Sequence, residues 1–291
     1  MRRLHVVPAI DEANGVYHVA RLLAQADGGE VRACSDVGRM DGFDEVIVHG
    51  MWLPREWIAC WKAVRSKRRL VRMTHGSLSP VYLERQGKRK KQLVGPIERF
   101  FLRRSEKVLA TCAAEKDWIL AYEPKVKNVE TIDLMRFFRL DAPHRPASAD
   151  NARRDFSSHI LYLGRRHPLK GVAFLERAVA EINRTVGQSN GRTLGFRAVS
   201  NAFGAEKEMV WKWCDVLCLP TLSENFGLVV AEALERGKTV IVTDGAPAWE
   251  AASPDGFGGR LTYVRGYRDG DDETRVRLLK EAICCVTGVK T

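Results

Sequence analysis

The chain has 291 residues, of which 45% are hydrophobic and 29% are charged, a composition typical of globular proteins with an apolar core. At roughly 100–200 residues per domain, this length predicts two domains. The sequence contains no run of about 18 apolar residues, so we expect no transmembrane helix. The apolar segment of the basic N-terminus is too short for a signal peptide, which favours a cytoplasmic protein.

The formal net charge of +11 would suit nucleic acid, an anionic membrane surface or an acidic substrate. The basic residues concentrate in two clusters of the first half, at 65–72 and 85–104. In the second cluster, basic residues alternate with apolar ones such as Leu93, Ile97 and Phe100. We interpret Lys88–Arg104 either as a solvated helix face or as an amphipathic segment that contacts anionic lipid, peripherally on the inner face of the membrane.

Seven cysteines, an odd number without a CxxC pair, indicate reduced thiols and no zinc site. Cys214 and Cys218 fall in a strand-like region and are expected to face the core.

Apolar runs and helical patterns alternate through the first half of the chain. Strands are expected at 4–8, 31–34, 45–49, 70–74, 107–111 and 128–132, and helices from Asn14-Gly15 onward and at 52–64, 92–104 and 113–122. Trp57 and Trp61 are four positions apart in one helix, a spacing more typical of core residues than of a binding site. The alternation predicts a mostly parallel, doubly wound sheet.

The segment 141–158 interrupts this pattern with prolines and no apolar periodicity, which predicts a domain boundary. We therefore expect a first domain at 1–145, a second at 146–275 and a terminal helix at 276–291 that packs back on the first domain. In the second half, strands are expected at 160–163, 196–200, 216–219 and 239–243, and helices at 172–182, 206–213, 227–236 and 274–286.

The most informative stretch is 220–234, where a strand feeds a polar turn and then a helix. A helix start offers free backbone N–H groups and a positive dipole end, which together bind anions. These donors come from Asn225, Phe226, Gly227 and Leu228. Glu224 and Glu232 flank them, and an ionised carboxylate accepts hydrogen bonds from hydroxyl groups. A phosphate flanked by polyols describes a nucleotide sugar; the plainer alternative is a capped βα unit.

A second loop, 164–171, leaves an apolar strand and carries Arg165 and Lys170 before the next helix. A planar guanidinium and a point charge at a strand's carboxyl end suit a diphosphate. The alternative is a surface loop with ordinary charges.

Together these motifs resemble the retaining glycosyltransferases of the family-4 type, the glycosyl transferases group 1. The diphosphate-binding GR…KG element is matched by Gly164-Arg165 and Lys170-Gly171, and the E-x7-E signature by Glu224 and Glu232. Further matches are the Glu206-Lys207 element with the run 213–221, the loop Asn14-Gly15-Val16, and the turns His49-Gly50-Met51-Trp52 and His75-Gly76-Ser77-Leu78.

The resemblance implies an α/β protein of the GT-B fold, with two Rossmann-like domains and a cleft between them. It assigns the donor's diphosphate to Arg165 and Lys170, hydroxyls of the transferred sugar to Glu224, and the ribose to Glu232. The N–H groups of Asn225, Phe226, Gly227 and Leu228 would bind the sugar or distal phosphate, Gly15 would let its loop approach the phosphate or acceptor, and His75 would reach the sugar. For His75, a capped loop residue is the plainer alternative.

Breaking a sugar–phosphate bond places negative charge on the leaving diphosphate, and preorganised positive groups there lower the barrier. Arg165, Lys170 and the helix start supply that charge, so we expect neither a metal ion nor a cofactor beyond the UDP-, GDP- or ADP-sugar substrate. The acidic run 269–272 lies in a glycine-rich linker and is not expected to bind metal. The resemblance further implies displacement on one face of the sugar, with the acceptor deprotonated by the leaving phosphate.

The sequence departs from the family between 191 and 204, where a strand–helix unit is shortened and the C-terminal domain looks trimmed. We expect a hexosyltransferase that serves a saccharide or lipid-linked acceptor in cell-surface glycan (lipopolysaccharide or polysaccharide) synthesis. One alternative is a nucleotide-sugar-binding protein without catalysis. A nucleic-acid-binding protein is a weaker alternative, because basic residues are not interleaved with aromatic residues on exposed strands. That alternative also leaves Glu224 and Glu232 unexplained.

Overall fold

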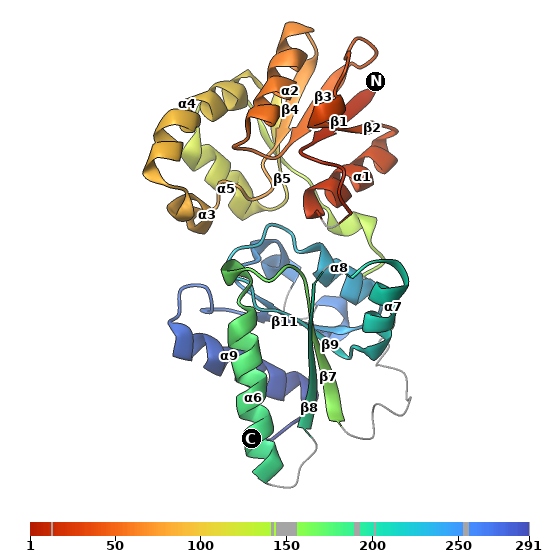
Figure 1. Ribbon diagram of the computed structural model, residues 1–291, viewed down its shortest axis with the longest axis vertical. Coiled ribbons are helices and arrows are strands. Elements are labelled where there is room, and N and C mark those ends of the chain that lie inside the picture. Colours follow the sequence, from red (N-terminus) through yellow and green to blue (C-terminus); the bar gives the residue numbers. More distant parts are fainter. Residues whose placement is uncertain are drawn as a thin grey trace. The chain divides into compact units, whose positions relative to one another are not determined.

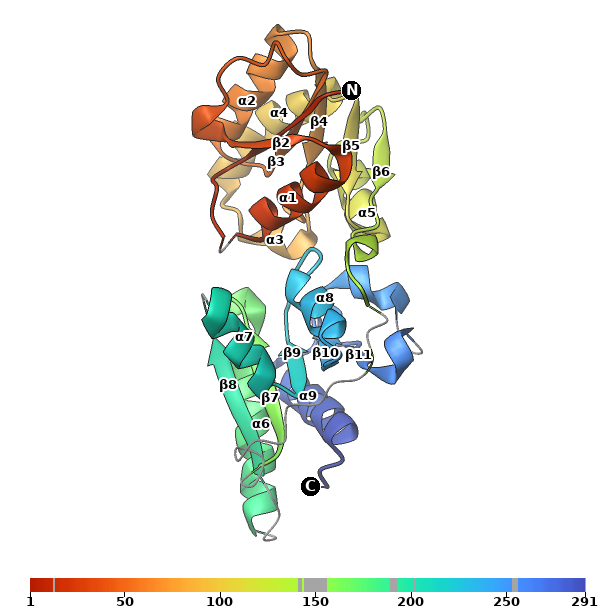
Figure 2. The ribbon, with the colours of Figure 1, turned by 90° about the vertical axis from the view of Figure 1, so that its right-hand side faces the viewer.

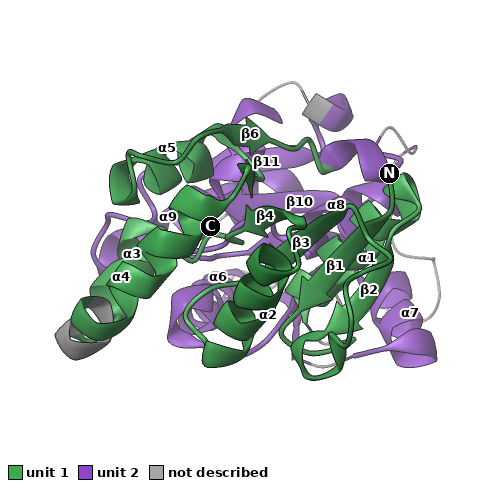
Figure 3. Ribbon diagram, turned by 90° about the horizontal axis from the view of Figure 1, so that it is seen from above, with its two compact units in different colours: residues 1–134 green, residues 135–291 purple. Residues whose placement is uncertain are grey.

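The computed structural model describes residues 1–12, 14–140, 143, 156–188, 193–200, 202–252 and 256–290. The chain forms two compact units, Met1–Leu134 and Met135–Thr291, which Figure 3 shows in different colours. The expected domain boundary at 145/146 lies outside the described residues, eleven positions after the point where the two units divide.

The first unit is built on a parallel sheet of six strands in the order β2-β1-β3-β4-β5-β6 (Figure 1). The strands are β1 (Arg3–Val7), β2 (Glu30–Ala33), β3 (Glu45–His49), β4 (Arg69–Met73), β5 (Lys107–Ala110) and β6 (Val129–Thr131). The helices are α1 (Gly15–Asp27), α2 (Pro54–Arg65), α3 (Pro80–Arg85), α4 (Lys88–Arg104) and α5 (Ala113–Tyr122). All five residues of β3 are buried, as expected of a parallel strand covered on both faces.

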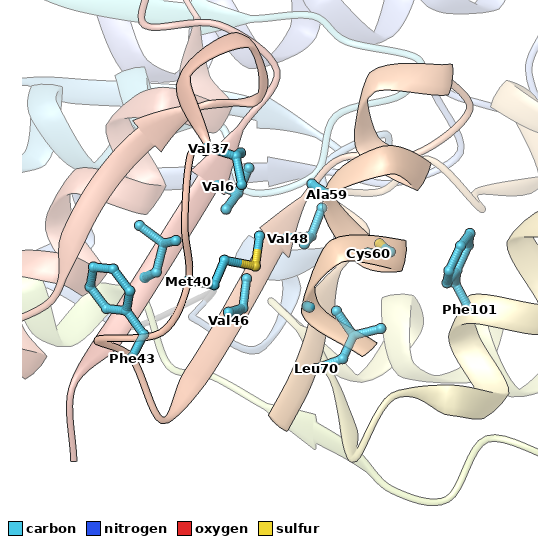
Figure 4. Close-up of a cluster of buried hydrophobic side chains, with 12 residues drawn as sticks. Val6, Val37, Met40, Phe43, Val46, Val48, Ala59, Cys60, Leu70 and Phe101 are labelled. Atoms are coloured by element: carbon cyan, nitrogen blue, oxygen red, sulfur yellow. The ribbon is translucent and has the colours of Figure 1, made fainter. Parts of the chain in front are cut away.

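The core of the first unit joins sheet and helix side chains (Figure 4). Val6, Val46 and Val48 of the sheet pack with Ala59 and Cys60 of α2. Burial of apolar area at about 25 cal/mol per Å² is the main stabilising contribution of such a cluster. This core holds the carboxyl ends of β1, β3 and β4, which are followed by the turns that the sequence analysis singled out, in fixed positions.

Two expectations for the first unit are wrong in part. Trp57 is half-buried against the core, but Trp61 is 54% exposed, so the pair does not share a buried environment. Arg72 was counted in the first basic cluster, yet it is fully buried and ion-paired with the buried Glu98 at 3.2 Å. A buried guanidinium needs such a partner, so this charge does not contribute to a basic surface.

The second unit is built on a parallel sheet of five strands in the order β11-β10-β9-β7-β8 (Figure 2). The strands are β7 (Phe156–Leu163), β8 (Thr193–Val199), β9 (Val216–Leu219), β10 (Thr239–Thr243) and β11 (Leu261–Val264). The helices are α6 (Val172–Gln188), α7 (Gly204–Trp213), α8 (Leu228–Glu235) and α9 (Asp272–Thr287). Strand β11 was not predicted, because four residues with a half-buried centre are too few to show a period.

Helix α9, the expected terminal helix, packs against α6 within the second unit. Two ion pairs join these helices, Lys280–Glu181 at 3.0 Å and Arg177–Glu273 at 2.6 Å. All seven cysteines are free thiols, and Cys214 and Cys218 are buried as expected. No helix in the described ranges has the length and apolar character needed to cross a bilayer.

Candidate functional site

The candidate site in the second unit is the loop 220–227, at the carboxyl end of β9. Several hydrogen bonds fasten this loop to its neighbours, among them the following three. The N–H of Leu222 donates to the Leu169 carbonyl (2.8 Å), the Thr243 hydroxyl to the Thr221 carbonyl (2.6 Å), and the N–H of Glu224 to the Gly245 carbonyl (2.8 Å). The loops after β7, β9 and β10 are therefore held together at one edge of the sheet, where ligands bind in open α/β folds.

Two glycines make this close approach possible. A Cβ atom on Gly171 would lie 1.9 Å from the Pro220 carbonyl oxygen, and one on Gly245 would lie 2.0 Å from that of Thr221. Gly171 also has a φ of 62°, which disfavours any side chain. Gly171 closes the GR…KG element, so the second glycine of that motif is explained by backbone packing.

Lys170 and Glu224 form an ion pair, with Nζ 2.5 Å from Oε2. Burial acts to raise the pKa of Glu224, but the Lys170 ammonium and its hydrogen bond outweigh that effect, so the pKa lies below its usual 4.5. Both side chains remain partly exposed. Lys170, which is predicted to bind phosphate, and Glu224, which is predicted to bind sugar hydroxyls, are thus adjacent. Glu224 is held as a carboxylate that can accept hydrogen bonds.

Arg165 is exposed and lies in the same loop as Lys170, after β7. Its carbonyl accepts a hydrogen bond from the Tyr162 hydroxyl (2.7 Å), which fixes the backbone of the loop after β7. Within the described ranges its guanidinium forms no ion pair or hydrogen bond, and its charge helps to lower the pKa of Glu224. The structure therefore places Lys170 in contact with Glu224, and Arg165 close enough for its charge to act on the same carboxylate.

Helix α8 begins one residue later than expected, with Gly227 as its N-cap at a φ of 70°. The N–H of Asn225 donates to Oε1 of Glu224 (3.1 Å), so it is not a free donor at the helix start. The Phe226 side chain is buried and packs against Trp249, with ring centroids 5.1 Å apart. Its contribution to a ligand site is thus limited to its backbone, alongside the N–H groups of Gly227 and Leu228.

Glu232 has a protein partner that the sequence did not reveal. The Lys207 ammonium donates to Oε1 at 2.9 Å and lies 2.7 Å from Oε2. Oε2 is buried and lacks a partner with hydrogen-bond geometry, so the short Lys207 contact is electrostatic. The resemblance assigned Glu232 to a ribose and did not anticipate Lys207 as a partner; one carboxylate oxygen still has room to accept a hydrogen bond. The Glu206-Lys207 motif was recognised in the sequence, but no role was assigned to Lys207.

The acidic run 269–272 forms local contacts around the start of α9. Asp271 caps the helix by accepting from the Thr274 N–H (2.8 Å), and Asp269 and Asp272 pair with arginines. In the part of the chain that the structure describes, no three His, Cys, Asp or Glu side chains are grouped as metal ligands.

His75 belongs to the first unit, in the turn after β4. Its φ of 50° is in the left-handed region, which histidine tolerates better than most residues. The turn is anchored by the fully buried Glu115, which accepts from the Thr74 hydroxyl and the Gly76 N–H, both at 2.6 Å. The N–H and the hydroxyl of Thr111 also donate to Glu115, both at 2.8 Å. Sequence reasoning missed Glu115, because an acid in the first turn of a helix usually signals only dipole stabilisation.

Gly15 is the first residue of α1, capped by the Asn14 side chain, which accepts from the Val16 N–H at 3.0 Å. It is exposed at the carboxyl end of β1. Beyond β1 and β2 lies a pocket of about 610 Å³, lined by 8–10, 33–36, Arg55 and Ile58. Gly15 and His75 thus belong to one unit. The cations and acids of the candidate site belong to the other, namely Arg165, Lys170, Glu224 and Glu232.

Two family models match the chain. The Glycosyl transferase 4-like domain covers residues 2–134 and Glycosyl transferases group 1 covers residues 157–265. The chain belongs to the group 1 glycosyltransferases of the family-4 type. A curated relative, the D-inositol 3-phosphate glycosyltransferase of Corynebacterium efficiens, is 24% identical to this glycosyltransferase in an alignment 222 residues long that covers 60% of this chain. The chain spans about half of that relative, 51% of its length.

Solved structures confirm the GT-B architecture of this glycosyltransferase. Sucrose-phosphate synthase from Thermosynechococcus elongatus aligns with a TM-score of 0.64 at 15% identity, over 100% of this chain and 92% of its own. An E. coli structure described as trehalose-6-phosphate bound with UDP-2-fluoro glucose gives 0.58 at 11% identity, over 98% and 92%. The lipopolysaccharide outer core galactosyltransferase WaaB gives 0.54 at 14%, over 100% and 92%. The predicted α/β fold class is therefore confirmed.

Proposed function

We propose that this glycosyltransferase moves a hexose-type sugar from a nucleotide-diphosphate sugar to a saccharide or lipid-linked acceptor, with retention and without a metal ion. The observation that carries the proposal is the adjacency of Lys170, Glu224 and Arg165 at the start of α8. One cluster then offers cations for a diphosphate and a carboxylate for sugar hydroxyls.

Charge development supports the absence of a metal ion from the reaction. When the sugar–phosphate bond breaks, negative charge grows on the diphosphate, and fixed positive groups stabilise it most in a site with little water. Arg165 and Lys170 provide two positive charges, and the N–H groups of Gly227 and Leu228 provide dipoles at the helix start. The leaving phosphate is then the base for the acceptor hydroxyl on the same face of the sugar.

Glu232 and Lys207 extend the site toward the nucleoside. The free capacity of Oε2 suits a ribose hydroxyl, and the Lys207 ammonium holds the carboxylate in place. The description of the E. coli neighbour as bound with UDP-2-fluoro glucose supports a nucleotide sugar as the ligand of this fold.

We assign the acceptor side to the first unit, with the pocket beyond β1 and β2 as its candidate position. Helix α4 exposes Leu93 (75%) and Phe100 (48%) beside Arg104, whose guanidinium lies 5.9 Å from the Phe100 ring centre. A basic helix with exposed apolar side chains suits a peripheral contact with anionic lipid. We therefore propose a cytoplasmic enzyme that works next to the membrane in cell-surface glycan synthesis.

The test is a panel of UDP-, GDP- and ADP-sugars, followed by thermal shift and by release of free nucleotide. A donor at 100 times its Kd should stabilise the protein by about 2.7 kcal/mol. This stabilisation should be lost in Glu232→Gln and kept in Glu235→Gln, a control on the same helix. Stabilisation without transfer would favour a non-catalytic binding protein, and no shift with any donor would overturn the proposal. Full activity in EDTA is expected.

A further inference from the structure

Three histidines of the first unit form a continuous chain of hydrogen-bonded imidazoles. Nδ1 of His5 lies 3.0 Å from Nε2 of His49, and Nδ1 of His49 lies 2.9 Å from Nε2 of His75. His5 is in β1, His49 ends β3 and His75 follows β4, so adjacent strands β1, β3 and β4 each contribute one ring. The first two rings are buried, and only His75 is partly exposed.

The buried end of this chain meets a carboxylate. Nε2 of His5 lies 3.2 Å from Oδ2 of Asp27, the last residue of α1. Within the described ranges, the other contacts of Asp27 are with donors. Its Oδ1 accepts from the Gly29 N–H at 2.9 Å, and Oδ2 lies 3.3 Å from the Arg3 guanidinium. An aspartate surrounded by donors is a carboxylate, which can only accept hydrogen bonds.

The number of protons on each ring determines which nitrogen donates in every hydrogen bond between these histidines. Burial lowers the pKa of His5 and His49 and lowers that of His75 to about 3, so each ring is neutral at neutral pH. A neutral imidazole has one donor and one acceptor nitrogen. His5 must donate to Asp27 from Nε2, and its Nδ1 therefore accepts from His49. His49 in turn accepts at Nδ1 from Nε2 of His75.

We propose that His49, His5 and Asp27 are positioning residues that hold His75 as its Nε2–H tautomer. Nδ1 of His75 is then a fixed acceptor for a hydroxyl group of a sugar substrate at the carboxyl edge of the first sheet. This inference rests on the proposed function for the identity of the substrate, but the tautomer itself does not.

The residues around the three histidines fit this positioning role. Arg3 and Glu45 act on His5 with opposite signs, and the buried Arg72 disfavours a positive charge on His49. The left-handed turn at His75 is held by Glu115, so the last ring is fixed through its backbone as well as through Nε2. Within the described ranges, Nδ1 of His75 has no hydrogen-bond partner. A triad aspartate orients its histidine in the same physical way, by fixing the tautomer.

The first test is nitrogen-15 NMR of the histidine side chains in the full chain, without substrate. We expect His5, His49 and His75 to be protonated at Nε2. His159 is an internal reference for the other tautomer, because its Nδ1 lies 3.0 Å from the Asp215 carboxylate. Protonation of His75 at Nδ1 in the unaltered protein would overturn the proposal, whether or not any variant folds.

Asp27→Asn tests the positioning role, since an amide can donate as well as accept. The variant should give His75 as a mixture of tautomers and lower kcat by about tenfold, the scale expected when one hydrogen bond to the substrate is lost. Asp27→Glu should restore both readouts in part. Asp44→Asn is the control, because Asp44 is a carboxylate of the same unit that accepts from the Arg2 N–H outside the chain of histidines.

The outcomes separate the two proposals. An unchanged His75 tautomer in Asp27→Asn, or an unchanged kcat with a changed tautomer, would overturn the positioning role. If the histidines have the expected tautomers but the protein transfers no sugar from any donor, the proposed function is overturned. The direction of the hydrogen bonds between the histidines would then remain confirmed.

Discussion

The Lys207 ammonium lies 2.7 Å from Oε2 and 2.9 Å from Oε1 of Glu232, so the second acid of the E-x7-E motif is part of an ion pair between α7 and α8. Both side chains are about one quarter exposed. Partly exposed pairs contribute roughly 0–1 kcal/mol to stability, so the larger consequence concerns the orientation of the carboxylate.

We therefore expect Lys207→Met to weaken donor binding more than it weakens the fold. Loss of the partner that orients Glu232 should raise the donor Kd about fivefold, equivalent to about 1 kcal/mol. Isothermal titration with the donor identified in the panel measures this change. Lys212→Met, an exposed lysine on the same helix, is the matched control. Equal affinities for the two variants would contradict an orienting role for Lys207.

The ion pair between Lys170 and Glu224 should make stability depend on pH in the acidic range. The pKa of Glu224 is lower in the folded protein than its usual 4.5. A group with a lowered folded pKa contributes stability above its unfolded pKa and loses that contribution as the pH falls through the folded value. The free energy of unfolding of the unaltered protein, minus that of Glu224→Gln, should therefore be constant near neutrality and decrease below about pH 4.5.

Denaturant unfolding of both proteins between pH 7 and pH 3 measures this difference. Glu176→Gln removes a carboxylate of an exposed ion pair with Arg166 and should show a smaller pH-dependent difference. A difference for Glu224→Gln that grows as the pH falls would have the wrong sign for the ion pair with Lys170.

The two glycines beside the loop 220–227 should be intolerant of any side chain. A Cβ on Gly245 would lie 2.0 Å from the Thr221 carbonyl oxygen, and the loop cannot yield without losing its hydrogen bonds to Leu169 and Thr243. Overpacking of this kind typically costs 1–3 kcal/mol. In Gly171→Ala the new side chain would also stand on a backbone with a positive φ. Left-handed backbone costs a residue with a side chain a further 1–2 kcal/mol.

We expect both alanine variants to lower the free energy of unfolding, Gly171→Ala by about 3 kcal/mol or more. Urea unfolding followed by circular dichroism measures the change. Gly187→Ala, at a helical position of α6 where a Cβ would meet nothing within 4 Å, is the control and should be neutral or stabilising. A neutral Gly171→Ala would mean that the loops after β7 and β9 are not packed this closely.

Much of the donor-side cluster could be predicted from sequence because its residues are local. Lys170 and Glu224 both follow short apolar strands, and the carboxyl ends of parallel strands meet at one edge of a sheet. Their spacing along the chain, 54 residues, did not matter once both strands were recognised. Strand β11 was missed for the opposite reason, since its pairing with β10 comes from tertiary structure and leaves little periodic signal.

Contacts between distant elements could not be predicted in the same way. Glu115 and Thr74 are 41 positions apart, and no local pattern assigns the first as the anchor of the His75 turn. Likewise, His5 reads as an interruption of an apolar strand until its 3.0 Å contact with His49 is seen. The burial of Arg72, a residue of strand β4, was missed because its partner Glu98 lies on helix α4, and sequence alone ranks an arginine as exposed.

The proposed lipid contact of α4 depends on exposed apolar side chains, of which Leu93 and Phe100 are the most exposed on that helix. We expect the protein to bind vesicles that contain phosphatidylglycerol and to bind phosphatidylcholine vesicles poorly, with affinity that falls as salt rises. Phe100→Asp should weaken binding tenfold or more, because removal of a buried phenylalanine side chain from lipid costs about 1.5–3 kcal/mol. Leu120→Asp, a 36% exposed position on α5, is the control. Cosedimentation measures both, and equal binding of Phe100→Asp and Leu120→Asp would mean that α4 is an ordinary solvated helix face.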